Sequence, residues 1–234
     1  MTTEGAVPGA ARHEAETAIR AVGDRALLVT PERREVVAEL VTALRAGPIP
    51  GVQDVLPAAE TVLLTLDSPR DREAVRRALT TILVSLRELV GDVSRKIVPD
   101  SAFQADPVVI PVRYDGADLD AVAELLELST AEVIAAHTGT VWRCAFVGFA
   151  PGFGYLESPD GRLSVPRRAQ ARTAIPAGAV ALAGGYSAVY PRNTPGGWQL
   201  IGTTETRMWD VERDPPALIR AGDTVRFVDA KEAG

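Results

Sequence analysis

Beyond residue 139, the sequence consists of short apolar runs that are separated by glycine and proline. Segments such as "TVWRCAFVG" and "PAGAVALAGGYSAVYP" follow one another in this way. Glycine and proline interrupt regular structure and mark turns, so each run is suited to one strand. The pattern is typical of a β-barrel or a β-sandwich. We therefore expect the second half of the chain to be built mainly from strands.

The first hundred residues have a different pattern, in which strands alternate with helices. "AIRAVGDRALLVT" and "GVQDVLPAAETVLLTLD" each predict two strands. A helix is expected to begin at Pro31, capped by Thr30, and to end before Gly47. A second helix is expected after Ser68, because apolar residues then recur along one face. With a further strand candidate in "SRKIVPD", this order predicts a small α/β sandwich.

The domain organisation follows from these two patterns. Residues 1–17 are small, polar and aperiodic, which predicts a disordered lead. Residues 18–104 form the expected N-terminal α/β domain, and residues 105–234 the expected β-barrel domain, giving an α+β chain. The barrel domain is expected to start with a strand in "PVVIPVRY", followed by two helices. The first covers residues 119–127, and the second begins after a capping box of Ser129 and Glu132 and ends near Gly139.

Composition limits the classes of partner. The chain has 234 residues, 46% of them hydrophobic, and a net charge of −6, which argues against nucleic acid or an anionic membrane as the main partner. No apolar run approaches the length that spans a bilayer. The single Cys144 cannot form an internal disulfide, and the first residues lack a secretory pattern, so the cytoplasm is the expected compartment.

Several common catalytic patterns are missing from the sequence. There is no phosphate-binding loop with the pattern G-x-x-x-x-G-K-[ST], no G-x-S-x-G and no paired-histidine motif. His13 and His137 are the two histidines, so no histidine-rich metal site is expected and no metal is predicted. Lysine occurs at positions 96 and 231 alone, so an anion site must use arginine or backbone amides. A Met-Lys pair for biotin attachment is also missing.

One cluster of motifs remains as a candidate ligand site. "GFAPGFGYLES" at 148–158 combines glycines with aromatic residues, "SVPRRAQAR" supplies three arginines, and "YPRNTPGGWQLIG" is a second glycine-rich segment. Glycines let backbone N–H groups approach a ligand, arginines bind carboxylate or phosphate in pairs of hydrogen bonds, and aromatic rings exclude water. Together these segments suit a small anion that is rich in oxygen.

Each of these features also has a purely structural interpretation. His137 is suited to cap the end of a helix, and the aromatic residues to cover one end of a barrel. Two adjacent arginines can be a solvated pair, "PGGW" can be a turn with a buried tryptophan, and Cys144 is expected in the core. From the residues alone, a ligand site and a structural cluster are about equally well supported.

The motifs "HTGTVWRCAFVGFAPGFGYL", "PAGAVALAGGYSAVYP" and "TPGGWQLIGTT" resemble the KipI family, whose members are also called the B subunit of bacterial 5-oxoprolinase or allophanate hydrolase subunit 1. The resemblance extends over residues 18–229 and includes "GDRALLV" and "AGDTVRFV". It implies a cyclophilin-like fold for the C-terminal barrel. It also implies a KipA-like partner, a LamB/YcsF-like partner, and ATP-dependent opening of 5-oxoproline to glutamate.

The same resemblance implies roles for particular residues. His137 would act as a general acid or base and Arg167 would hold an anionic group, which makes these two the expected catalytic residues. The expected substrate-binding residues are Gly148, Phe149, Pro151, Gly152, Phe153, Tyr155, Arg168, Tyr190, Pro195, Gly196, Gly197 and Trp198. The chain departs from the family pattern at Tyr186, where glutamine is frequent, and at Ala171, where proline is usual.

Three other functions remain open at this stage. Fused members of the family form the carboxyltransferase part of biotin-dependent urea carboxylase, so this chain could serve a urea or amide carboxylase with a separate biotin carrier. The founding member of the family inhibits a sporulation histidine kinase. A prolyl isomerase activity would rest on the cyclophilin-like fold alone, which is a weak basis for a function.

Overall fold

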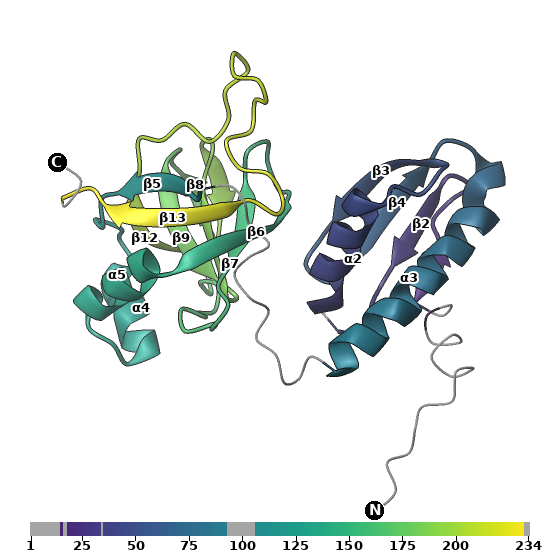
Figure 1. Cartoon of the computed structure of the whole chain (residues 1–234). Helices are drawn as coiled ribbons and strands as arrows, with labels where there is room; N and C mark the ends of the chain where they lie inside the picture. Colours follow the sequence, from purple (N-terminus) through teal and green to yellow (C-terminus); the bar gives the residue numbers. More distant parts are fainter. Residues whose placement is uncertain (1–14, 16–17, 34, 93–105, 232–234) are drawn as a thin grey trace, which may run out of the picture. The chain divides into compact units, whose positions relative to one another are not determined.

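The chain divides into two compact units, residues 1–100 and 101–234 (Figure 1). The computed structural model describes residues 15, 18–33, 35–92 and 106–231. The strand expected in "SRKIVPD" and the domain boundary expected at 104 and 105 lie outside these described residues, as does most of the expected lead. Within that lead, Ala15 is described, and its side chain is buried in the core of the first unit.

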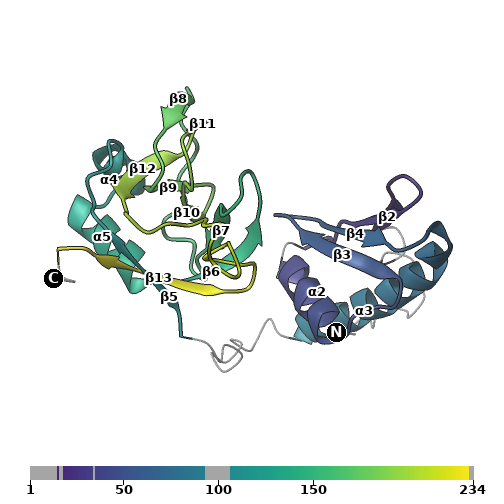
Figure 2. The ribbon, with the colours of Figure 1, turned by 90° about the horizontal axis from the view of Figure 1, so that it is seen from above.

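The first unit is a four-stranded antiparallel sheet that packs against two helices. The sheet has the order β1-β2-β4-β3. Alternate residues of the strands and the apolar stripes of both helices share one core, so the helices lie on the same face of the sheet (Figure 2). The elements are β1 (Ile19–Ala21), β2 (Ala26–Val29), α2 (Glu35–Ala46), β3 (Val52–Pro57), β4 (Val62–Leu66), the 3₁₀ turn η1 (Pro69–Asp71) and α3 (Arg72–Asp92).

Within the described residues, the predicted strands and helices of this unit are confirmed, apart from the start of the first helix. Helix α2 begins at Glu35 and not at Pro31. The reason is that the backbone N–H of Thr30 donates to the carbonyl oxygen of Ala18 (2.8 Å). Thr30 therefore continues the pairing of β1 with β2 and is not a helix cap. The second helix follows Ser68, whose hydroxyl accepts a hydrogen bond from the backbone N–H of Arg70.

The second unit is a seven-stranded sheet with the order β12-β9-β10-β7-β6-β13-β5, beside a two-stranded ladder of β8 and β11. Arg113, just after β5, and Thr203, the last residue of β12, exchange two backbone hydrogen bonds of 2.8 Å, which link the two edges of the sheet into a barrel. Its elements are β5 (Val108–Val112), α4 (Leu119–Leu126), α5 (Thr130–Gly139), β6 (Val141–Val147), β7 (Gly154–Glu157), β8 (Arg172–Ile175), β9 (Ala179–Ala183), β10 (Tyr186–Val189), β11 (Thr194–Gly196), β12 (Gln199–Thr203) and β13 (Thr224–Asp229).

The interior of the barrel is filled with side chains. Trp142, Cys144, Leu182 and Phe227 are at most 1% exposed and belong to one apolar core. Helix α4 packs against β12 and α5 against β13, so the two helices cover the barrel from one side (Figure 1). The predicted α+β class and the C-terminal barrel are confirmed, as is the capping box at the start of α5.

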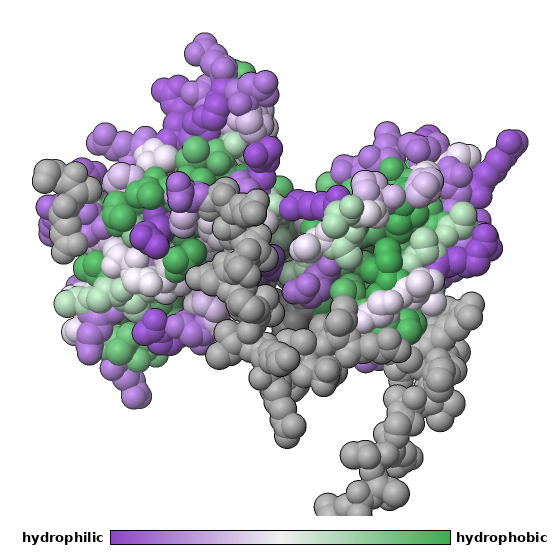
Figure 3. All heavy atoms as spheres, in the orientation of Figure 1, coloured by the Kyte–Doolittle hydropathy of each residue, from purple (hydrophilic) through white to green (hydrophobic). Residues whose placement is uncertain are grey.

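A long connection between β12 and β13 rises from the barrel. It is the green-to-yellow loop at the top of this unit in Figure 1, and Figure 3 shows mainly hydrophilic residues there. In the described part of the chain, no helix is both long enough and apolar enough to cross a membrane.

Candidate functional site

The loop 148–153, between β6 and β7, has a tightly folded backbone. The N–H of Gly148 donates to the carbonyl oxygen of Phe153 (3.1 Å), and the N–H of Phe153 donates to that of Ala150 (2.9 Å). Phe149 has a φ of 67°, in the left-handed region that costs a residue with a side chain about 1 to 2 kcal/mol. Such strain is found most often at functional sites. In this loop the strained residue is Phe149, which is 58% exposed.

Gly152 is required by its surroundings as well as by its backbone. Its φ is 82°, and a Cβ at this position would lie 2.9 Å from the Cβ of Trp209 and 3.0 Å from the carbonyl oxygen of Met208. The loop therefore rests against the long connection before β13. Gly148, by contrast, has room, because the nearest atom to its Cβ position lies 3.8 Å away in Tyr155.

Seven of the twelve aromatic residues in the chain meet around this loop, and we call them the aromatic cluster. Phe153 is 1% exposed and makes edge-to-face contacts with four other rings, at centroid distances of 5.0 to 5.5 Å. Tyr155 stacks on Phe146 at 4.2 Å. Phe149 also contacts Tyr190, at 6.2 Å. The cluster consists of Phe146, Phe149, Phe153, Tyr155, Tyr186, Tyr190 and Trp198.

The aromatic cluster lies on the outer face of the barrel sheet. In β6 and β7, Cys144 pairs with Leu156, and both side chains belong to the core. The next pair is Phe146 with Tyr155, because β6 has one extra residue at this point, which is a β-bulge. The bulge moves Phe146 to the face opposite Cys144, where it can stack on Tyr155. None of the seven rings belongs to the barrel core.

Two tyrosine hydroxyls in the aromatic cluster lie within electrostatic range of Arg167. Burial raises the pKa of Tyr190 to about 12, helped by the neighbouring Tyr155, and the charge of Arg167 opposes this rise. Burial also raises the pKa of Tyr155, again against Arg167. Both hydroxyls therefore stay protonated at neutral pH and can donate hydrogen bonds. Arg167 is exposed and makes no ion pair or hydrogen bond with any residue that the structure describes.

The neighbouring arginines are bound to a carboxylate that the sequence did not indicate. Arg172 donates two hydrogen bonds of 2.8 Å to the carboxylate of Asp118, and Arg168 donates a third. The backbone N–H of Leu200 donates a fourth, at 2.7 Å. Burial opposes ionisation of Asp118, but these donors hold its pKa below the ordinary value. Arg168 thus binds a carboxylate within the protein through one nitrogen of its guanidinium, and its expected role in binding substrate stays a prediction.

The "PGGW" segment supports the aromatic cluster from a second side. A Cβ on Gly196 would lie 2.5 Å from the hydroxyl oxygen of Tyr190, so a glycine is needed there. The carbonyl oxygen of Gly197 accepts a hydrogen bond from the backbone N–H of Arg168 (2.8 Å). Trp198 is 5% exposed and contacts Phe153, whereas Pro195 and, in the other loop, Pro151 are exposed.

His137 lies elsewhere, and its expected role as a general acid or base is not supported by its surroundings. Its side chain is fully buried at the end of α5, with Nδ1 2.7 Å from the hydroxyl of Tyr114 and Nε2 2.8 Å from that of Ser187. Its ring stacks on Phe227 at 4.3 Å. Burial lowers the pKa of His137 to about 3, so the ring is neutral and both nitrogens have partners.

The barrel sheet separates His137 from the aromatic cluster. Ser187 and Tyr186 are consecutive residues of β10, so their side chains point to opposite faces. Ser187 contacts His137 on the inner face, and Tyr186 contacts Phe146 and Tyr155 on the outer face. The structure therefore brings both glycine-rich segments and Arg167 together, and leaves His137 in the core.

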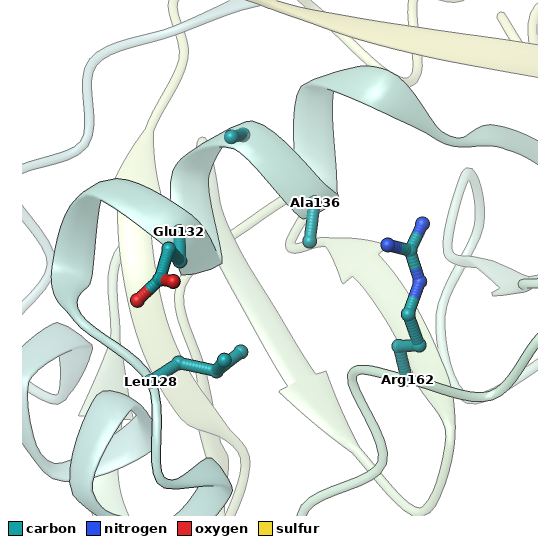
Figure 4. A pocket seen from close by; sticks show the side chains of 5 residues that line it. Leu128, Glu132, Ala136 and Arg162 are labelled. Carbon is teal, nitrogen blue, oxygen red and sulfur yellow. The ribbon is translucent and has the colours of Figure 1, made fainter.

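A separate cavity of about 360 Å³ lies between α5 and the loop that follows β7 (Figure 4). Its two charged residues already have partners: the carboxylate of Glu132 accepts hydrogen bonds from Ser129, and Arg162 pairs with Asp160. The other lining residues are Leu128, Ala135 and Ala136. Among the residues described, no group of three or more His, Cys, Asp or Glu side chains is arranged to hold a metal ion.

Comparisons with known proteins identify the family. The model of the carboxyltransferase domain, subdomains C and D, matches residues 17–219. The B subunit of 5-oxoprolinase from Bacillus subtilis (strain 168) is 35% identical over 223 residues, which cover 92% of this chain and 93% of that protein. The chain belongs to this carboxyltransferase-domain family. The resemblance to the KipI family is thereby confirmed.

Two solved structures share the fold within longer chains. TTHA0988 is 35% identical with a TM-score of 0.67, over 88% of this chain and 40% of that one. Urea carboxylase of Kluyveromyces lactis, at 18% identity, has a TM-score of 0.66 over 92% of this chain and 22% of that one, and shows the fold alone. This chain thus spans less than half the length of either solved protein.

The buried His137 predicts a pH dependence of stability. Folding lowers the pKa of His137 from 6.5 to about 3. Between these two pH values, the unfolded chain binds a proton at His137 that the folded chain does not bind. Stability is therefore expected to fall as the pH falls from about 6.5 to about 5, by about 1.4 kcal/mol per pH unit once the unfolded histidine is protonated. In His137→Gln this contribution is expected to vanish. All three tryptophans lie in the second unit, so urea unfolding followed by their fluorescence reports on it. Equal slopes in both proteins would contradict the prediction.

The same substitution is expected to affect the stability of the two glycine positions of the loop unequally. Gly152→Ala is expected to destabilise the second unit by about 1 to 3 kcal/mol, because its left-handed backbone and its contact with Trp209 leave no room for a methyl group. Gly148→Ala is the matched control, with an expected change within about 0.5 kcal/mol. The same fluorescence measurement compares them, and equal losses in the two variants would show that the loop does not rest against Trp209.

Proposed function

We propose that this chain is the B subunit of an ATP-dependent 5-oxoprolinase, which opens 5-oxoproline to L-glutamate together with a KipA-like and a LamB/YcsF-like subunit. Family membership supports this proposal, as do curated relatives that are named as the B subunit of 5-oxoprolinase and are 35% to 40% identical. The first of these relatives matches over nearly the full length of both chains. The proposed role is that of one subunit in an enzyme, not of an enzyme by itself.

One observation carries the assignment of the site: the exposed guanidinium of Arg167 lies beside the aromatic cluster, in which the partly exposed Tyr155 keeps a protonated hydroxyl. 5-Oxoproline has a carboxylate, a lactam carbonyl and an apolar ring face. Arginine binds a carboxylate with paired, charge-assisted hydrogen bonds. The hydroxyl of the partly exposed Tyr155 can donate to an oxygen of the lactam or of a phosphorylated intermediate, and the exposed ring of Phe149 can cover the apolar face.

ATP has a clear chemical purpose in this reaction. A lactam amide is a poor electrophile, and phosphorylation of its oxygen gives a better electrophile with a good leaving group. The enzyme must then stabilise phosphate charge and hold the carbonyl in place. The described site fits this demand only in part, because Arg168 and Arg172 are bound to Asp118, which leaves Arg167 as the arginine of its segment that can hold an anion. We therefore propose that a partner subunit supplies most of the contacts to ATP.

The surroundings of the titratable side chains bear on which subunit supplies the catalytic base. Tyr155 and Tyr190 have raised pKa values, so neither is a base at neutral pH, and each keeps its proton to donate a hydrogen bond. His137 is neutral, buried and on the inner face of the sheet. This chain is therefore proposed to bind and orient the substrate, and the base that activates water is proposed to come from a partner subunit.

The decisive experiment reconstitutes the complex. The chain is purified with its KipA-like and LamB/YcsF-like partners, and glutamate release from 5-oxoproline is measured with and without ATP. Release is expected only when all three proteins and ATP are present, with one ATP consumed for each glutamate. A complete set of proteins that leaves 5-oxoproline intact while binding neither substrate nor ATP would overturn the proposal.

Arg167→Ala tests the site in the reconstituted complex. It is expected to lower kcat/KM for 5-oxoproline by about tenfold to a hundredfold, mainly through KM, because a charged hydrogen-bonding partner of the substrate is lost. Arg162→Ala is the matched control, since Arg162 is another exposed arginine of the same unit and pairs with Asp160. If both variants keep the parent's KM, the substrate does not bind at Arg167.

The alternative is a carboxyltransferase component of a biotin-dependent urea or amide carboxylase, which the description of the matching family favours. It predicts transfer of a carboxyl group from carboxybiotin, on a separate carrier protein, to urea or a related amide. The two proposals separate in one assay: labelled bicarbonate incorporated into an acid-labile product supports the carboxylase, and ATP-dependent glutamate release supports the 5-oxoprolinase.

A further inference from the structure

Asp118 occupies an unusual position for an aspartate at the start of a helix. It is the N-cap residue of α4, where a carboxylate ordinarily accepts a hydrogen bond from the first turn, yet here it makes no such bond. Its side chain is 3% exposed, and both carboxylate oxygens are directed to partners far away in the sequence. The helix start is thus not what the carboxylate stabilises.

All the partners of the carboxylate belong to segments that frame the candidate site. Arg168 and Arg172 lie in the segment that carries Arg167, and Leu200 belongs to the strand that follows Trp198. A buried charge is tolerated only when it is paired and hydrogen-bonded, and this one has four hydrogen bonds. The paired bonds from Arg172 also fix the orientation of its side chain, because the planar guanidinium matches the carboxylate along one edge.

The segment 166–172 has few other anchors. Apart from Arg168 and Arg172, its residues are exposed. Its backbone is also held where Arg172 pairs with Gly196 at the start of β8, and by hydrogen bonds from Arg168 N–H to the carbonyl oxygen of Gly197 and from Gln199 to that of Pro166. The side chains that anchor the segment beside Arg167 are therefore those of Arg168 and Arg172, and both of them bind Asp118.

We propose that Asp118 is a positioning residue of the candidate site, which holds segment 166–172 through Arg168 and Arg172 so that Arg167 faces the hydroxyls of Tyr155 and Tyr190. Asp118 binds the segment through these two arginines and does not itself contact the ligand. This inference rests on the proposed function for its kinetic test. Its structural test is independent of that function.

Because Asp118 is charged, a kinetic test can distinguish a positioning role from a purely electrostatic one. Three guanidiniums and one carboxylate leave this region positive. If Asp118 served only as a counter-charge, Asp118→Asn would make the region more positive, and KM for the anionic 5-oxoproline would fall. If Asp118 positions Arg167, the same change releases the segment and KM rises. The two roles therefore predict changes of opposite sign.

A double-mutant cycle in the reconstituted complex measures whether Asp118 acts through Arg167. Asp118→Asn is expected to raise KM about tenfold in the parent protein and to change it less than about twofold in the Arg167→Ala background. Asp115→Asn is the matched control, because Asp115 pairs with Arg113 in an exposed ion pair of the same unit. An Asp118→Asn effect of equal size in both backgrounds, or a lowered KM, would overturn the inference.

Trypsin, which cuts after arginine, tests the same inference without any activity. Asp118→Asn is expected to speed cleavage after Arg167, Arg168 or Arg172 by at least about tenfold in the full chain, with fragments identified by mass, while Asp115→Asn leaves it unchanged. Arg172→Lys keeps the charge but loses the paired bonds, and serves as the second variant if Asp118→Asn does not fold. Unchanged cleavage in the folded variant would overturn the positioning role. Faster cleavage in a complex without 5-oxoprolinase activity would overturn the proposed function alone.

Discussion

The filled interior of the barrel constrains everything else in the second unit. Because the inward side chains of the described strands pack into one apolar core, they leave no lumen among them in which a ligand could bind. The candidate site lies on the outer face instead, beside the loops and the β8–β11 ladder. A single bulge in β6 serves this arrangement, since it moves Phe146 from the inner to the outer face and so adds a ring to the aromatic cluster.

The same constraint separates two kinds of polar group. His137, Tyr114 and Ser187 form a satisfied hydrogen-bonded set on the inner side, where a charged imidazole would be costly. Arg167 and Tyr155 lie on the outer side, where solvent or a ligand can reach the exposed guanidinium and the partly exposed phenol, and Tyr190 is buried beneath them. Asp118 connects the layers, because it starts a helix that covers the barrel and holds the arginine segment of the site.

Much of this could be predicted from the sequence, and the failures have definite causes. Turn residues and helical spacing located most strands and helices, and the glycine-rich segments pointed to the aromatic cluster. The start of α2 was wrong because Thr30 can cap a helix or extend a strand, and only its pairing with Ala18 decides between them. Asp118 was missed because an aspartate before a helix has the pattern of a cap, whatever its carboxylate binds. Arg167 and Arg168 are adjacent and chemically identical, so the sequence could not show that Arg168 alone of the two is bound to a described carboxylate.

The sequence by itself determined the family, the order of the elements and the segments that make the candidate site, because these depend on local residue patterns and on resemblance. Tertiary structure alone decided which side chains share a face and which charges are already paired. Those properties depend on strand register, on one bulge and on contacts between residues such as Asp118 and Arg172, which are 54 positions apart. No local pattern encodes a contact of that separation, because it forms only when the barrel closes.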